Sequence, residues 1–211
     1  RTSLPGGYLG PKINKVSDIL QLNDIFYVSS DSQQSYSLEQ IPKINGGIII
    51  MDPYTGRVFA LSGGFDFNKS NFNRVIQAKR QPGSSFKPFV YMSALENGLQ
   101  PNSLILDAPF VVDQGSGLGK WKPENYGKKF YGPSTLRKGI ENSRNLMTIR
   151  IAQYLGMEKV SEIAKRSGVM ENMPNVLSMA LGAGETSLID LTAAYASFVY
   201  GGKKVEPSLI D

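Results

Sequence analysis

From residue 46 onward, the apolar and polar positions follow regular patterns that predict a hairpin and then a series of helices. Two short apolar runs, 48–51 and 57–61, flank the turn-forming residues 52–56 and predict a β-hairpin. Beyond the hairpin, apolar residues recur at helical spacing, and glycine follows several of these segments, as it often follows the end of a helix. The predicted helices are 86–96, 135–141, 146–155, 159–167 and 188–199.

The first 45 residues differ in pattern from the rest of the chain. Residues 4–7 are loop-forming, residues 25–28 are apolar and predict a strand, and residues 31–37 are polar. We interpret residues 1–45 as a linker with the remnant of a small β module, and a simple surface hairpin is the alternative.

The helix predicted at 86–96 has a defined start. Proline lacks an N–H and is tolerated in the first turn of a helix, so Pro88 places the first helical residue at Ser84 or Ser85. The apolar positions that follow predict a buried face, which belongs to the core rather than to a cofactor site. These positions are Phe89, Val90, Met92 and Leu95.

Ser84 and Lys87 are the first candidates for chemistry. The 211 residues contain no histidine and no cysteine, so an imidazole base and a thiolate nucleophile are excluded within them. Residues i and i+3 of a helix lie on one face, which brings Ser84 and Lys87 together and points Ser85 elsewhere. The positive end of the helix dipole also stabilises negative charge on an attacked carbonyl. If the chain uses a serine nucleophile, lysine is its base.

Short motifs of this kind also occur without function. Ser-x-x-Lys at 84–87 and Ser-x-Asn at 143–145 are each expected roughly once or twice by chance in such a chain. Taken alone, Ser84 is typical of a helix N-cap, and Ser143 with Asn145 is typical of a cap pair before Leu146. The surrounding sequence has to decide between capping and catalysis.

The composition is that of a globular domain with a basic surface. With 211 residues and 41% hydrophobic content, the chain can bury one sizeable core. Its net charge of +5 is spread along the chain, and no basic run with interleaved aromatic residues indicates a nucleic-acid partner. No segment is long and apolar enough to cross a bilayer, and no signal peptide opens the chain.

Eight blocks of sequence occur in a characteristic order. They are GGIIIMDPYTG (46–56), GGFDF (63–67), FNR (72–74), RQPGSSFKPF (80–89), WKPENY (121–126), SRN (143–145), LGAGE (181–185) and AAYA (193–196). In these blocks the chain resembles the transpeptidase domain of class A, bifunctional penicillin-binding proteins, which cross-link peptidoglycan. The ordered series is far more specific than either short motif.

The resemblance implies an α+β fold, the penicillin-binding and serine β-lactamase-like transpeptidase fold. In it an antiparallel sheet packs against a helical subdomain, with the active site between them. The family's third motif, Lys-Thr-Gly or Lys-Ser-Gly, is absent from these residues and in the family lies on a strand that would follow Asp211. Residues 46–211 are therefore expected to be the N-terminal part of the domain, without its later strands, and this chain alone is expected to acylate slowly or not at all.

The resemblance also implies a serine acyl-enzyme mechanism of D,D-transpeptidation. Ser84 attacks the carbonyl between the last two D-alanines of a stem peptide, and neutral Lys87 accepts the serine proton. Ser143 passes a proton to the departing amine, while Asn145 holds the peptide amide and orients Lys87, so Ser84 and Asn145 are also the expected substrate-binding residues. An amine from a second stem then forms the cross-link, or water trims the stem as in a D-Ala-D-Ala carboxypeptidase.

The expected partners are peptidoglycan stem peptides and β-lactams, which mimic the D-Ala-D-Ala end and acylate Ser84. No metal or organic cofactor is needed, and the lack of histidine and cysteine disfavours a soft metal site. The family has a membrane anchor and a glycosyltransferase domain upstream. The expected location is therefore the periplasmic, outer side of the inner (plasma) membrane, with membrane contact only through an N-terminal anchor that these residues lack.

Two alternative functions on the same fold stay open. One is a non-catalytic β-lactam sensor or cell-wall binding module, and the other is a serine β-lactamase, which shares Ser-x-x-Lys. Two positions also have open structural roles. Trp121 is either a packing residue or part of the cleft wall, and residues 182–184 form a tight turn near the cleft rather than a phosphate cradle, since no Lys-Ser/Thr follows them.

Overall fold

The computed structural model describes residues 14–30, 36–39, 44–113 and 119–210. Its contacts divide the chain into two units, 1–44 and 45–211. The first unit contains a 3-10 turn, η1 (Val16–Asp18), and an antiparallel pair of strands, β1 (Tyr27–Ser30) and β2 (Tyr36–Glu39). The predicted strand therefore begins two residues later than expected. Every side chain of the pair is exposed, so the two strands have no buried core of their own.

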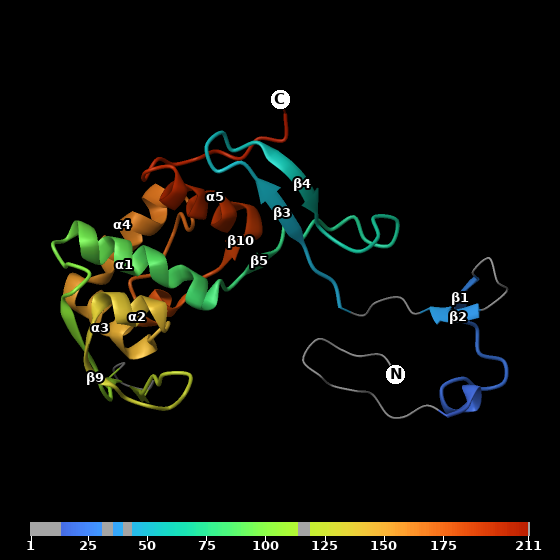
Figure 1. Ribbon diagram of the computed structural model, residues 1–211, viewed down its shortest axis with the longest axis horizontal. Helices are drawn as coiled ribbons and strands as arrows, with labels where there is room; N and C mark the ends of the chain where they lie inside the picture. The colour runs from blue at the N-terminus through green and yellow to red at the C-terminus, as the bar shows by residue number, and fades with distance from the viewer. Residues whose placement is uncertain (1–13, 31–35, 40–43, 114–118, 211) are drawn as a thin grey trace. The chain divides into compact units, whose positions relative to one another are not determined.

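The second unit combines helices with short antiparallel strand pairs (Figure 1). The hairpin predicted from the sequence is present as β3 (Ile48–Met51) and β4 (Val58–Ser62), with a bulge after Ile50. The other pairs are β5 (Lys79–Arg80) with β10 (Thr186–Ser187), β6 (Leu104–Asp107) with β9 (Gly132–Thr135), and β7 (Val112–Asp113) with β8 (Lys120–Trp121).

All five helices predicted from the sequence occur. They are α1 (Lys87–Glu96), α2 (Leu136–Glu141), α3 (Asn145–Leu155), α4 (Met157–Ser167) and α5 (Leu188–Val199). Two 3-10 segments, η2 (Gly83–Phe86) and η3 (Leu177–Leu181), precede α1 and β10. Helical conformation thus begins at Gly83, one residue before the predicted start, and Pro88 lies in the first turn of α1. No helix of the described ranges is long and apolar enough to span a membrane.

The core is built around α1, which contacts α2, α3, α4 and η3. Phe89 and Val90 are fully buried, as the predicted apolar face requires. The prediction is wrong at Leu95, which is 48% exposed, whereas Tyr91 and Ala94 are buried in its place. Because helices pack on several sides of α1, its buried positions do not form a single stripe.

The β3–β4 hairpin packs against α5 through β3 (Figure 1). Its turn is stabilised by the carboxylate of Asp52, which accepts hydrogen bonds from the Tyr54 N–H at 2.9 Å and the Thr55 hydroxyl at 2.8 Å. Such side-chain bonds to the backbone two residues on are typical of turns that begin with aspartate. Strand β5 leads directly into η2, the segment that carries Ser84.

Candidate active site

Ser84 lies on η2, between strand β5 and helix α1. Three contacts hold this segment: Arg80 on β5 pairs with Thr186 on β10, the Gly83 N–H donates to the Gly182 carbonyl at 3.2 Å, and the Tyr195 hydroxyl donates to the Ser85 carbonyl at 2.7 Å. The Ser84 side chain is exposed and caps neither η2 nor α1. The capping alternative is therefore wrong for Ser84, whose hydroxyl makes no hydrogen bond with any described residue.

Lys87 is buried, with 2% of its surface exposed, and its ammonium donates three hydrogen bonds. The acceptors are the Ser143 carbonyl at 2.6 Å, the Ser143 hydroxyl at 2.9 Å and the Asn145 Oδ1 at 2.6 Å. Residues 56 and 58 positions apart in sequence thus meet at one amine. Burial lowers the pKa of Lys87 from 10.5 to about 8, because desolvation penalises the charged form.

The Lys87 amine does not bond to Ser84 in this structure. The two residues are one 3-10 turn apart, and the Lys87 N–H donates to the Ser84 carbonyl. Side chains at positions i and i+3 of a 3-10 turn eclipse each other, so both residues lie on the same side of the segment. The Lys87 amine donates instead to three acceptors, two on Ser143 in the α2–α3 connection and one on Asn145 at the start of α3.

Ser143 and Asn145 approach Lys87 from the start of α3. Ser143 has a φ of +51°, an uncommon conformation for a residue other than glycine. The N-cap of α3 is Arg144 and makes no side-chain cap, so the interpretation of Ser143 and Asn145 as a cap pair is wrong. The Asn145 amide instead bridges two elements: its Oδ1 faces Lys87, and its Nδ2 donates to the Glu124 carbonyl at 2.8 Å.

The hydrogen bonds of Lys87 suit a group that changes its protonation state. A protonated lysine has three N–H donors and no lone pair, and each of the three acceptors here takes one donor. After a proton is lost, two N–H bonds can remain on the Ser143 carbonyl and the Asn145 Oδ1. The Ser143 hydroxyl can then reverse and donate to the amine, because a hydroxyl both donates and accepts.

Two contacts of the site could not be found by motif. Glu124 and Tyr195 lie in the blocks 121–126 and 193–196. The acceptors in these two contacts are the backbone carbonyls of Glu124 and Ser85, which no residue type marks in a sequence. Trp121 is half-buried and packs against the cluster of Phe110, Leu146 and Ile149, which favours its packing role.

Gly182 ends η3 and lies against Gly83 of the serine segment. Its φ is +75°, and a Cβ atom added there would lie 2.1 Å from the Gly83 carbonyl oxygen. Neither the strained conformation nor the backbone contact tolerates a side chain. The position of η2, and so of Ser84, depends on glycine here.

We expect Gly182→Ala to lower the free energy of unfolding by about 2–3 kcal/mol, from the backbone strain and from displacement of η2. Gly201→Ala is the matched control, because Gly201 has a φ of +66° but open space around its Cβ position. Gly201→Ala should lower the free energy of unfolding only through the strained backbone conformation, by about 1 kcal/mol. Urea unfolding followed by far-UV circular dichroism measures both, and equal losses would show that the contact with Gly83 is unimportant.

Comparison with known proteins places this chain in a family. Residues 46–211 match the model of the penicillin-binding protein transpeptidase domain. Penicillin-binding protein 1A of Rickettsia conorii is 47% identical over 196 residues, which are 93% of this chain and 25% of that protein. Penicillin-binding protein 1A of Pseudomonas aeruginosa is 40% identical over 100% of this chain and 26% of that protein. The chain thus spans about a quarter of the length of these relatives.

Solved structures show the same fold. The crystal structure of penicillin-binding protein 1A from Haemophilus influenzae has a TM-score of 0.79 and 34% identity, over 87% of this chain and 27% of that chain. PonA1 from Mycobacterium tuberculosis in complex with penicillin V has a TM-score of 0.67 and 26% identity, over 78% of this chain and 45% of that chain. The predicted α+β transpeptidase fold is confirmed, and the chain belongs to the penicillin-binding protein transpeptidase domain family.

Proposed function

We propose that this chain is the N-terminal part of a serine D,D-transpeptidase domain that cross-links peptidoglycan stem peptides, within a bifunctional class A penicillin-binding protein. The observation that carries the proposal is the buried Lys87 amine, bonded to Ser143 and Asn145 one 3-10 turn from the exposed Ser84. Relatives named penicillin-binding protein 1A support the class. The proposed location is the outer side of the plasma membrane, where the proposed substrate lies.

In the acylation step, the Ser84 Oγ attacks the carbonyl carbon between the two terminal D-alanines. Neutral Lys87 accepts the serine proton, since only the unprotonated amine has a lone pair. The C–N bond then breaks, and the departing D-alanine amine receives a proton from Lys87 through the Ser143 hydroxyl. Asn145 holds the substrate amide while its Oδ1 keeps Lys87 in place.

In the second step, an amine from a neighbouring stem attacks the ester on Ser84 and forms the cross-link. Lys87 and Ser143 remove the proton from the attacking amine, and Ser84 regains its own proton as it leaves. Water in place of the amine gives a trimmed stem, which is the carboxypeptidase outcome. A β-lactam follows the first step only, and its opened ring stays on Ser84.

The test is the intact mass of the full-length protein after incubation with benzylpenicillin, followed by peptide mapping. One adduct per chain, mapped to Ser84, is the expected result. A folded protein without an adduct would instead favour the non-catalytic cell-wall binding module. Rapid hydrolysis of a chromogenic β-lactam would favour a serine β-lactamase. Stem peptides incubated with and without an amine acceptor then separate transpeptidation from trimming by their products.

The acylation rate should depend on pH through Lys87. The pKa of Lys87 is lowered to about 8, so the neutral base is the minor form at pH 7 and the major form above pH 8. The rate constant should rise with pH, reach half its maximum near pH 8 and fall about tenfold for each unit below it. A stopped-flow series from acid to alkaline pH measures this, and a flat profile would contradict Lys87 as the proton acceptor.

A further inference from the structure

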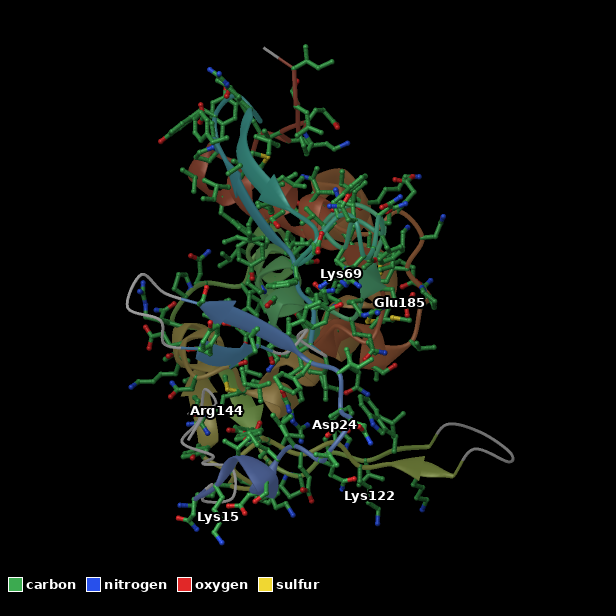
Figure 2. All side chains as sticks on the ribbon, turned by 90° about the vertical axis from the view of Figure 1, so that its right-hand side faces the viewer. Lys15, Asp24, Lys69, Lys122, Arg144 and Glu185 are labelled. Atoms are coloured by element: carbon green, nitrogen blue, oxygen red, sulfur yellow. The ribbon has the colours of Figure 1, made fainter. Side chains whose placement is uncertain are left out.

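A second polar cluster, formed by Asp107, Asn125 and Arg144, lies next to the α2–α3 connection that carries Ser143. Asp107, at the end of β6, is 0% exposed, and Asn125 is 5% exposed. The Asn125 Nδ2 donates to the Asp107 Oδ1 at 2.7 Å and to the Lys129 carbonyl at 2.9 Å. The Arg144 guanidinium, labelled in Figure 2, has its Nε 3.9 Å from the Asp107 Oδ2. It also lies over the Tyr131 ring, 3.3 Å from the centroid.

This cluster holds two consecutive groups at the start of α3. The Asn125 Oδ1 accepts from the Leu146 N–H at 3.3 Å, and the neighbouring Glu124 carbonyl accepts from the Asn145 Nδ2 at 2.8 Å. The second bond sets the orientation of the Asn145 amide. A carbonyl accepts only from the NH₂ side, so the Oδ1 is the atom that remains for Lys87.

The stability of the fold does not explain why this cluster is buried. A buried carboxylate is costly to desolvate, and the Asp107 Oδ2 has no hydrogen-bond partner in the described part of the chain. Ser143 also has a left-handed conformation, which is strained for a residue other than glycine and persists only where the surrounding structure imposes it. Arg144 follows Ser143 directly, and its guanidinium is held between Asp107 and Tyr131. The cluster therefore fixes the turn that carries two of the three acceptors of Lys87.

We propose that Asn125, held by Asp107, is a positioning residue of this site: it fixes the 124–125 segment, and through it the Asn145 amide that orients the Lys87 amine. The inference rests on the proposed function, because acylation is the reaction it is expected to affect. Asn125 itself makes no hydrogen bond with Lys87 or Ser84. Because the Asn145 amide also holds the substrate in the proposed mechanism, Asn125 should affect the chemical step most, through Lys87, and the binding of substrate less.

The test compares Asn125→Ala with the unsubstituted full-length protein in rapid-mixing experiments with benzylpenicillin. We expect the acylation rate constant within the complex to fall about tenfold to a hundredfold, because small misplacements of reacting groups have effects of this size. The dissociation constant of the first, non-covalent complex should rise by a smaller factor, because the contact of Asn145 with the substrate amide is weakened but not removed. The endpoint should remain one adduct per chain, because each folded molecule still reacts.

Two further variants separate positioning from folding. Asp107→Asn keeps the shape and an acceptor for Asn125 but removes the charge beside Arg144, and should lower the same rate constant by a smaller factor. Asn172→Ala, at an exposed asparagine, should change neither constant.

Three outcomes would overturn the inference. An acylation rate constant of Asn125→Ala within about twofold of the unsubstituted value is the first. An unchanged rate constant with fewer labelled chains is the second, since it shows a role in folding alone. The third is an unsubstituted protein that takes no label, which removes the proposed function together with the inference, whereas the first two leave the proposed function standing.

Discussion

Ser84→Ala should abolish the benzylpenicillin adduct, whereas Ser85→Ala should leave it intact. The two serines are adjacent, both are exposed, and both belong to η2. Removal of a nucleophile eliminates the covalent step, so the labelling rate should fall at least about 10⁴-fold. Ser85 takes part through its backbone carbonyl, which accepts from Tyr195 and survives the substitution. Intact mass after a fixed incubation measures both variants.

The neighbouring serine makes the comparison specific. A general disturbance of η2 would affect both variants alike, because both lose a hydroxyl in the same turn. An adduct that persists in Ser84→Ala and maps to another residue would refute Ser84 as the nucleophile. Full-length Ser84→Ala should also form no cross-links from stem peptides, which extends the test from the inhibitor to the substrate.

Lys87→Arg should lower the acylation rate by about 10²–10⁴-fold, the usual contribution of a positioned acid–base group. Arginine keeps a positive charge and several N–H donors for the Ser143 and Asn145 oxygens, but its guanidinium does not deprotonate in proteins. The substitution therefore removes the proton acceptor and retains much of the hydrogen bonding. The residual rate should also lose its rise near pH 8, because that rise belongs to the lysine amine.

The control for this change is Lys159→Arg, at an exposed lysine on α4, which should react at the unsubstituted rate. Because Lys87 is buried and arginine is larger, circular dichroism should establish that Lys87→Arg is folded before its rate is measured. A folded Lys87→Arg protein with more than a tenth of the original rate and the same pH profile would mean that another group accepts the serine proton.

Helical periodicity made most of the fold predictable. Apolar residues at helical spacing, together with proline and glycine near the helix ends, were enough to predict the five helices without tertiary information. The pairs β5–β10, β6–β9 and β7–β8 were not predicted. Two-residue strands carry no alternation, and β9 begins with Gly132 and Pro133, which indicate a turn rather than a strand. The exposure of Leu95 was also missed. Spacing places a residue on a face of a helix, but the neighbouring helices determine which faces are covered.

The candidate site, like the fold, was only partly predictable from the sequence. The motif order brought Ser84, Lys87, Ser143 and Asn145 into one hypothesis, and the last three lie in contact. Spacing alone suggested a bond between Ser84 and Lys87, which the structure lacks. A buried ammonium takes the arrangement that satisfies all three donors, and the sequence does not reveal where those acceptors will lie. Asp107 and Asn125 were missed because their roles depend on tertiary contacts, with each other, with Arg144 and with the backbone of Leu146, that no local sequence pattern marks.

The packing of Trp121 has an optical consequence. The 211 residues contain one tryptophan, so indole emission from them arises at a single place. Trp121 contacts the cluster at the start of α3 and lies three residues before Glu124, which holds the Asn145 amide. A shift of residues 121–124 should change the polarity around the indole and therefore the wavelength and intensity of its fluorescence emission. The chain thus contains its own unlabelled reporter, next to the groups that orient Lys87.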